Sequence, residues 1–194
     1  MWFRNLRGRD MKKLAIFDLD GTLYDTRDVN YHSYEAALEQ YGYELDYKYF
    51  SNYCNGRHYK EFLPEIMRDT KHMEDVHNLK KKYYKDYLNK AKENEHLFQM
   101  VQCMKSDYYI AIVTTASRKN CEEILEYHNR LQNFDLIISS EDVNNKKPDP
   151  EGFLKAMEHF GVGGSQTVVF EDSDVGVEAA QKSGATVFVV KGFS

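Results

Sequence analysis

Five short apolar runs punctuate this sequence, and four of them stop abruptly at an acidic or hydroxyl-bearing residue. The runs are residues 13–17, 108–113, 135–138, 167–170 and 185–190. A short apolar run bounded by turn signals is typical of a strand that is buried on both faces of a parallel sheet. Helix-like segments separate the later runs, at 118–128, 150–160 and 174–183. This alternation predicts an α/β fold built on a Rossmann-like, doubly wound parallel sheet.

The segment between the first and second runs has a different character. Residues 28–96 are rich in Tyr, Lys and Glu and show no strand pattern, so we expect an inserted α-helical cap, with a long charged helical segment at 79–94. The core then comprises residues 11–27 and 97–194. Residues 1–10 are expected to be a leader, an alternative start or a disordered segment. Acidic residues surround the run 80–82, which we interpret as a solvated helix face and not as a nucleic-acid patch.

The net charge, the apolar windows and the cysteines exclude several classes of protein. The chain has 26 Lys and Arg against 31 Asp and Glu, a net charge of −5, which disfavours nucleic acid and anionic membranes as partners. No window approaches the roughly 18 apolar residues of a membrane span, and the N-terminus lacks the apolar core of a signal peptide. The 3 cysteines include no CxxC pair. We expect a cytoplasmic protein that is a monomer or a weak homodimer.

Polar side chains follow the predicted strands at the edge where a parallel sheet binds its ligands, beyond the carboxyl ends of the strands. They are Asp18, Asp20, Thr114, Lys147, Glu171 and Asp172. Four carboxylates in one crevice repel one another strongly unless a divalent cation lies between them. Hard oxygen ligands that leave room for water and a substrate phosphate favour Mg²⁺.

This set of side chains suits the cleavage of a phosphate ester. A carboxylate nucleophile divides the reaction into two steps through an aspartyl-phosphate. Two residues further along a strand, a second carboxylate points to the same side. It can protonate the leaving oxygen and then deprotonate the attacking water. A metal, a lysine and a hydroxyl can balance the charge on the transferring oxygens.

Four motifs of the chain, in order, resemble those of the haloacid dehalogenase (HAD) superfamily. They are Asp18-Leu19-Asp20-Gly21-Thr22-Leu23, Thr114, Lys147-Pro148 and Glu171-Asp172-Ser173-Asp174-Val175-Gly176. Within it, the chain is similar to the phosphatases and mutases that carry a small helical cap after the first strand, such as phosphoglycolate phosphatase and β-phosphoglucomutase. The resemblance implies a Mg²⁺-dependent core in which Asp18 is the nucleophile and Asp20 the acid/base.

The same resemblance implies the remaining site roles. Asp18, the backbone carbonyl of Asp20, and Asp172 would hold Mg²⁺, with Glu171 assisting. Thr114 would bind the transferring phosphoryl group and Lys147 would balance its charge.

Alternatives stay open at three positions. As the first residue past its strand, Thr114 is favoured over Thr115, which is kept as a second substrate-binding candidate. Lys147 is favoured over Lys146 because a proline follows it. In the cap, Arg57 follows Asn55-Gly56 and could give a bidentate contact to a substrate carboxylate or second phosphate, although a solvent-facing arginine would fit the sequence equally well.

The sequence therefore predicts a Mg²⁺-dependent phosphatase of a small phosphorylated metabolite, either a sugar phosphate or a phosphoglycolate-like compound. The alternative is a sugar-phosphate mutase that uses the same aspartyl-phosphate. Mutases of the family usually carry His five residues past the aspartate of a pair like Asp25-Thr26, and here that residue is Asn30. Dehalogenases lack the second carboxylate, so Asp20 counts against that activity. Phospho-receiver domains place the acceptor on a middle strand, whereas Asp18 follows the first.

Overall fold

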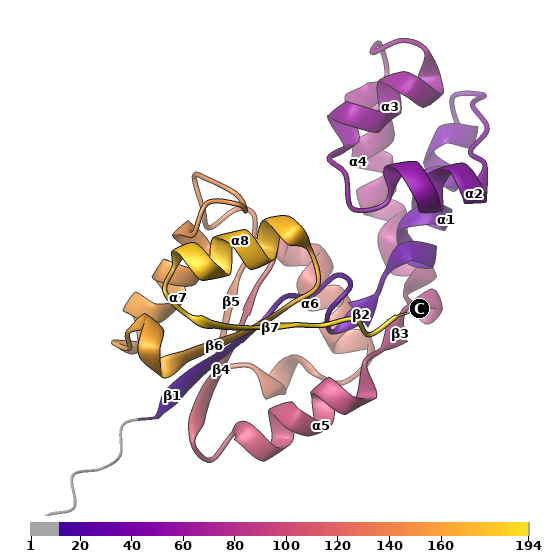
Figure 1. Cartoon of the computed structure of the whole chain (residues 1–194). Helices are drawn as coiled ribbons and strands as arrows, with labels where there is room; N and C mark the ends of the chain where they lie inside the picture. Colours follow the sequence, from indigo (N-terminus) through magenta and orange to yellow (C-terminus); the bar gives the residue numbers. More distant parts are fainter. Residues whose placement is uncertain (1–11, 194) are drawn as a thin grey trace, which may run out of the picture.

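A five-stranded parallel sheet forms the centre of the protein (Figure 1). The computed structural model describes residues 12–193, so the predicted leader at 1–10 lies outside the described residues. The strand order is β5-β4-β1-β6-β7. The strands are β1 (Lys13–Phe17), β4 (Tyr108–Val113), β5 (Leu136–Ile138), β6 (Thr167–Glu171) and β7 (Thr186–Val189). The predicted doubly wound α/β core is confirmed.

The central strand β1 is apolar along its length because helices cover both faces of the sheet. Its residues Leu14 and Ile16 pack on one side, with α7 and α8, while Ala15 and Phe17 pack on the other, with α5 and α6. Successive side chains of a strand point to opposite faces, so one run of apolar residues serves both layers. The helices are α5 (Glu95–Met104), α6 (Arg118–Tyr127), α7 (Glu151–Phe160) and α8 (Asp174–Lys182), with 3₁₀ turns η3 (Leu131–Asn133) and η4 (Gly164–Gln166).

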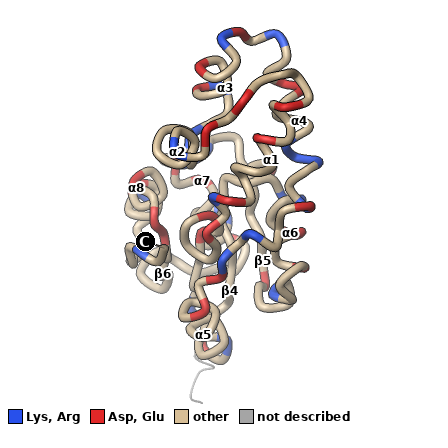
Figure 2. Tube along the Cα trace, turned by 90° about the vertical axis from the view of Figure 1, so that its right-hand side faces the viewer, with Lys and Arg blue, Asp and Glu red and all other residues tan. Residues whose placement is uncertain are grey.

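A separate group of helices projects from the carboxyl edge of the sheet (Figure 1), and acidic and basic residues are interspersed along it (Figure 2). It has its own apolar core, centred on Phe50, Phe62 and Leu63. Its elements are α1 (Arg27–Glu39), α2 (Tyr47–Tyr49), the π-helical η1 (Phe50–Cys54), α3 (Tyr59–Met67), α4 (Met73–Tyr83) and the 3₁₀ segment η2 (Tyr84–Lys90). We refer to this group as the cap; its exact boundaries stay a prediction. None of the helices within residues 12–193 is long and apolar enough to cross a membrane.

The two crossings between core and cap lie side by side as a small antiparallel ladder of β2 (Tyr24–Asp25) and β3 (Lys92–Glu93). The prediction of a continuous helix at 79–94 without strands is therefore wrong. The helix tightens to 3₁₀ geometry after Tyr83 and then becomes extended to pair with the first crossing. Strands this short carry no periodicity from which they could be predicted.

The burial of Lys80 contradicts a second expectation. The expected solvated face at 80–82 is wrong for Lys80, which is only 7% exposed, while Lys81 and Lys82 are exposed. The Lys80 ammonium lies 5.3 Å from the ring centre of Tyr34 in α1 and 4.7 Å from that of Tyr84 in η2. The cause is the packing of α4 along α1, which turns every fourth residue of α4 inward.

Candidate active site

The loop after β1 brings the first motif against the end of β6. Leu23 and Tyr24 both donate their amide N–H to the carbonyl of Leu19, which closes a tight turn. Gly21 adopts a φ of +94°, and a Cβ at this position would lie 2.1 Å from Oδ2 of Asp172. Only glycine fits there, because the positive φ and the missing side chain are both required. Thr22 adds a hydrogen bond of 2.9 Å from its hydroxyl to Oδ1 of Asp172.

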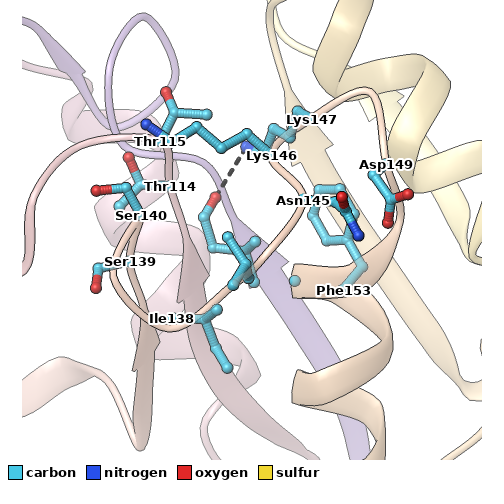
Figure 3. A pocket seen from close by; sticks show the side chains of 13 residues that line it. Thr114, Thr115, Ile138, Ser139, Ser140, Asn145, Lys146, Lys147, Asp149 and Phe153 are labelled. Atoms are coloured by element: carbon cyan, nitrogen blue, oxygen red, sulfur yellow. Dashed lines mark hydrogen bonds between the residues drawn. The ribbon is translucent and has the colours of Figure 1, made fainter.

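Lys147 joins the first and last motifs. Its Nζ donates to Oδ1 of Asp18 at 2.6 Å, to Oε1 of Glu171 at 2.6 Å and to the carbonyl of Val113 at 2.9 Å, the last drawn as the dashed line in Figure 3. Burial alone would lower the pKa of this ammonium, but Asp18 and Glu171 raise it above its ordinary value. Lys147 is thus held as a buried cation between two carboxylates.

The two carboxylates differ in how they are held. Glu171 is completely buried, and its Oε2 accepts hydrogen bonds of 3.0 Å from both the amide and the hydroxyl of Ser173, the N-cap of α8. The pKa of Asp18 is raised well above its usual range, mainly by burial and in addition by the charge of Glu171, although Lys147 opposes both effects. Burial and Glu171 therefore disfavour the charged form of Asp18, and the Lys147 ammonium offsets this only in part.

Asp20 has a different partner. The hydroxyl of Thr26, at the start of α1, donates to its Oδ1, and the amide of Asn30 donates to the Thr26 hydroxyl at 3.2 Å. Burial raises the pKa of Asp20 more than Thr26 and the ammonium charges of Lys80 and Lys147 lower it. A carboxyl group in such surroundings retains a proton more readily than an exposed aspartate does.

Three carboxylates fit a divalent cation. Asp18, Glu171 and Asp172 each offer an oxygen, and these oxygens lie within 4.8 Å of one another. Burial raises the pKa of Asp172 to about 6, and the charge of Glu171 contributes, although the Thr22 hydrogen bond opposes the shift. Oxygen ligands at this spacing are those that Mg²⁺ prefers.

The chain resembles known proteins in both sequence and fold. The sequence profile of the haloacid dehalogenase-like hydrolases matches residues 15–190. The chain belongs to this family. It is 31% identical to a phosphorylated carbohydrates phosphatase of Thermotoga maritima, over 88% of this chain and 81% of that protein. It is 26% identical to a phosphoglycolate phosphatase of Aquifex aeolicus, over 89% and 81%. The fold superposes on CbbY of Rhodobacter sphaeroides with a TM-score of 0.79 and 23% identity, over 94% and 88%.

In this hydrolase the two threonines after β4 lie on one pocket with Lys147 and Lys146 (Figure 3). Thr114 is buried, and its hydroxyl accepts a hydrogen bond of 3.0 Å from the amide of Ala116, whereas Thr115 is exposed. Lys146 is also exposed, in contrast to Lys147. The phosphoryl-binding role of Thr114, with Thr115 as its competitor, stays a prediction.

The structure does not bring Arg57 to these groups. Its side chain is 39% exposed and pairs with Glu61 at 3.4 Å and Glu65 at 3.2 Å, and it donates to the carbonyl of Tyr53 at 2.8 Å. All of these partners belong to the cap surface. A substrate contact by Arg57 stays a prediction.

Sequence reasoning missed Lys80 as a buried cation near Asp20. A signal was present in the spacing, because Val76, Lys80, Tyr84 and Leu88 recur every four residues and all four are buried. Such a stripe marks the inward face of a helix. The neighbouring lysines concealed it by suggesting a charged surface.

Gly21 provides a direct test of the metal site. We expect Gly21→Ala to weaken Mg²⁺ binding roughly 10–100-fold, because the new Cβ displaces the Asp172 carboxylate from the cluster. Gly42→Ala is the matched control, since Gly42 also has a positive φ of +76° but nothing lies within 4 Å of a Cβ there. Titration calorimetry with Mg²⁺ measures both. Equal affinities in the two variants would contradict the role of Asp172.

Proposed function

We propose that this hydrolase is a Mg²⁺-dependent phosphatase of a small phosphorylated metabolite, a sugar phosphate or a phosphoglycolate-like compound, and that it acts through an aspartyl-phosphate on Asp18. The observation that carries the proposal is the contact of Lys147 with both Asp18 and Glu171 at 2.6 Å, beside the third carboxylate of Asp172. Nucleophile, fixed cation and metal-binding oxygens then occupy one crevice at the carboxyl edge of the sheet.

In the first step, an oxygen of Asp18 attacks phosphorus and forms an O–P bond while the ester O–P bond breaks. Asp20 gives its proton to the departing alcohol oxygen, a role that suits a buried carboxyl group with a raised pKa. Lys147 and Thr114 would bind the oxygens of the transferring group. When bound by Asp18, the Asp20 carbonyl and Asp172, with Glu171 assisting, Mg²⁺ would supply positive charge to the same oxygens.

In the second step, Asp20 acts as the base. It removes a proton from water as the water oxygen bonds to phosphorus, and the O–P bond to Asp18 breaks. Asp18 returns as a carboxylate, Asp20 again holds a proton, and inorganic phosphate leaves. Thr26 holds one oxygen of Asp20 throughout, so the other oxygen remains free to exchange the proton.

The names of the two relatives support a phosphorylated carbohydrate or acid as the substrate. Asn30 favours hydrolysis over the mutase reaction, since the mutases usually carry His at this place. In the structure the Asn30 amide only supports Thr26, 3.2 Å away.

The test is phosphate release from p-nitrophenyl phosphate. We expect turnover with Mg²⁺, loss of turnover on chelation, and recovery when Mg²⁺ is restored. A panel of phosphorylated sugars and acids then identifies the substrate. Isomerisation of a sugar monophosphate without release of phosphate would establish the mutase alternative, and no reaction with any member of the panel would refute the phosphatase.

A further inference from the structure

The second crossing from cap to core continues beyond β3 into Asn94, which contacts the loop after β1. The side-chain oxygen of Asn94 accepts a hydrogen bond of 3.3 Å from the amide of Leu97 and so caps the start of α5. Its side-chain nitrogen Nδ2 donates to the backbone carbonyl of Thr22 at 3.2 Å. One side chain therefore closes a helix and also braces the loop that carries the first motif.

The backbone of Asn94 adds to this brace. Its N–H donates to the carbonyl of Leu23 at 2.9 Å, and Leu23 in turn donates its own N–H to the carbonyl of Leu19 at 3.0 Å. Two successive carbonyls of the loop are thus held by a single residue that lies 72 positions after Thr22 in the chain. A replacement of the Asn94 side chain leaves the backbone bond in place, so it isolates what the side-chain amide does.

The residue before Asn94 fixes this crossing to the core. Glu93 accepts hydrogen bonds of 2.8 and 3.2 Å from the guanidinium of Arg130, which form a bidentate contact. The hydroxyl of the completely buried Tyr24 in β2 donates to the same carboxylate at 3.5 Å. A bidentate arginine–carboxylate pair fixes orientation as well as adding energy. Asn94 therefore projects from a backbone that is attached to the core on either side of it.

The braced residue Thr22 also holds one carboxylate of the metal cluster. Thr22 is completely buried, and its hydroxyl donates to Oδ1 of Asp172 at 2.9 Å. Asp172 is the exposed member of this cluster, whereas Asp18 and Glu171 are buried. Hydrogen bonds to a ligating carboxylate fix the orientation in which it meets a metal. The position of Thr22 consequently decides how the Asp172 carboxylate is aimed.

We propose that Asn94 is a positioning residue for the metal site, which acts through Thr22 to hold the Asp172 carboxylate in the orientation that binds Mg²⁺. The inference rests on the proposed function, which requires the metal, and adds a residue of the second crossing to it. Because Asn94 acts through another residue, its loss should weaken the metal site without removing a ligand.

Asn94→Ser separates this role from helix capping, because serine caps a helix as well as asparagine does but has no amide to donate to Thr22. In calorimetry, Asn94→Ser and Asn94→Ala should both weaken Mg²⁺ binding roughly 3–10-fold, as expected for the loss of one hydrogen bond. Only Asn94→Ala, which also loses the cap, should lower Tm in the presence of a chelator, by about 2–4 °C. Mg²⁺ binding that is weakened in Asn94→Ala but not in Asn94→Ser would overturn the inference, since Asn94 would then be a helix cap alone.

Gly192 allows the amide to be displaced while Asn94 itself is unchanged. A Cβ on Gly192 would lie 2.7 Å from Nδ2 of Asn94, so Gly192→Ala should push this nitrogen away from Thr22. We expect Gly192→Ala to weaken Mg²⁺ binding by about as much as Asn94→Ser. Gly163→Ala is the matched control, because nothing lies within 4 Å of a Cβ there, and its affinity should equal that of the unmodified chain. Equal affinities in the two alanine variants would contradict the inference.

Thr22→Val tests the route from Asn94 to the metal site. This replacement removes the hydroxyl that holds Asp172 and keeps the backbone carbonyl that Asn94 contacts. We expect it to weaken Mg²⁺ binding roughly 10–100-fold. Adding Asn94→Ser to Thr22→Val should then weaken binding by less than about 2-fold more, because the amide has no hydroxyl left to position. Additive losses in the double variant would mean that Asn94 does not act through Thr22, and would overturn the inference.

The same binding measurements separate this inference from the phosphatase proposal. Mg²⁺ binding that depends on Asn94, in a chain that hydrolyses no phosphate ester, would support the inference and refute the proposed function. Mg²⁺-dependent turnover of p-nitrophenyl phosphate, together with equal Mg²⁺ affinities in Asn94→Ser and the unmodified chain, would leave the phosphatase standing and overturn the role of Asn94. A chain that binds no Mg²⁺ would overturn both.

Discussion

Asp18→Asn should abolish phosphate release, with kcat at least about 10⁴-fold below that of the unmodified chain. The reason is chemical, since an amide at this position cannot form the aspartyl-phosphate. Acid-quenched reactions with labelled substrate should trap phosphate on the unmodified protein and none on the variant. The measurement therefore reports the covalent step itself.

The variant should fold as well as the parent. Asn has the shape of Asp, and the replacement leaves Lys147 with Glu171 at 2.6 Å and the Val113 carbonyl at 2.9 Å as partners. Two carboxylates share this ammonium in the unmodified protein, and the raised pKa of Asp18 shows that its negative charge is disfavoured there, chiefly by burial. In the absence of metal, Tm should accordingly stay equal or rise.

Asp107→Asn is the control. Asp107 precedes β4 at the opposite edge of the sheet and is exposed, so its replacement should leave turnover unchanged. Residual turnover above about 1% in Asp18→Asn, in protein freed of contaminating phosphatase, would rule out Asp18 as the nucleophile.

The core could be predicted from the sequence because its central strands β1, β4 and β6 are largely buried on both faces, although the edge strand β7 is mostly exposed. Ala15 and Phe17 pack with one helical layer and Leu14 and Ile16 with the other, so the run is apolar throughout and stops where the ligand edge begins. Asp18 lies where this run ends. Because β1 pairs in parallel with β6, Glu171 and Asp172 at the end of β6 lie beside it. Topology alone thus brought three of the predicted metal ligands together.

The cap could not be predicted in the same way. Its two-residue strands β2 and β3 are held by pairing with each other, and no local pattern encodes that contact. Arg57 was singled out by its neighbours in sequence, whereas its partners Glu61 and Glu65 are set by the turns of α3. Lys80 lies among charged residues, and only the packing of α4 on α1 decides which lysine turns inward.

The buried Lys80 leads to the second prediction, which concerns the stability of the fold. Lys80→Met should raise the free energy of unfolding at pH 7 in the presence of a chelator. The folded protein holds Lys80 with a pKa of about 8, against an ordinary value of 10.5, because burial disfavours the ammonium. This depression corresponds to about 3 kcal/mol of destabilisation while the group is charged. A methionine of similar length fills the space between Tyr34 and Tyr84 without a charge, and its thioether packs well against aromatic rings.

The sign of the pH dependence distinguishes this cause from improved packing. Below pH 8, Lys80 is protonated in both folded and unfolded chains, and the full penalty applies. Between about pH 8 and 10.5 the unfolded chain binds the proton that the folded chain has released, so this group makes stability rise with pH. The advantage of Lys80→Met should therefore be largest at pH 7 and shrink toward pH 10. Urea unfolding at both pH values measures this advantage. Lys81→Met is the control, and its free energy of unfolding should differ little from that of the unmodified chain at either pH. An advantage that does not change with pH would mean that Lys80 carries no buried charge.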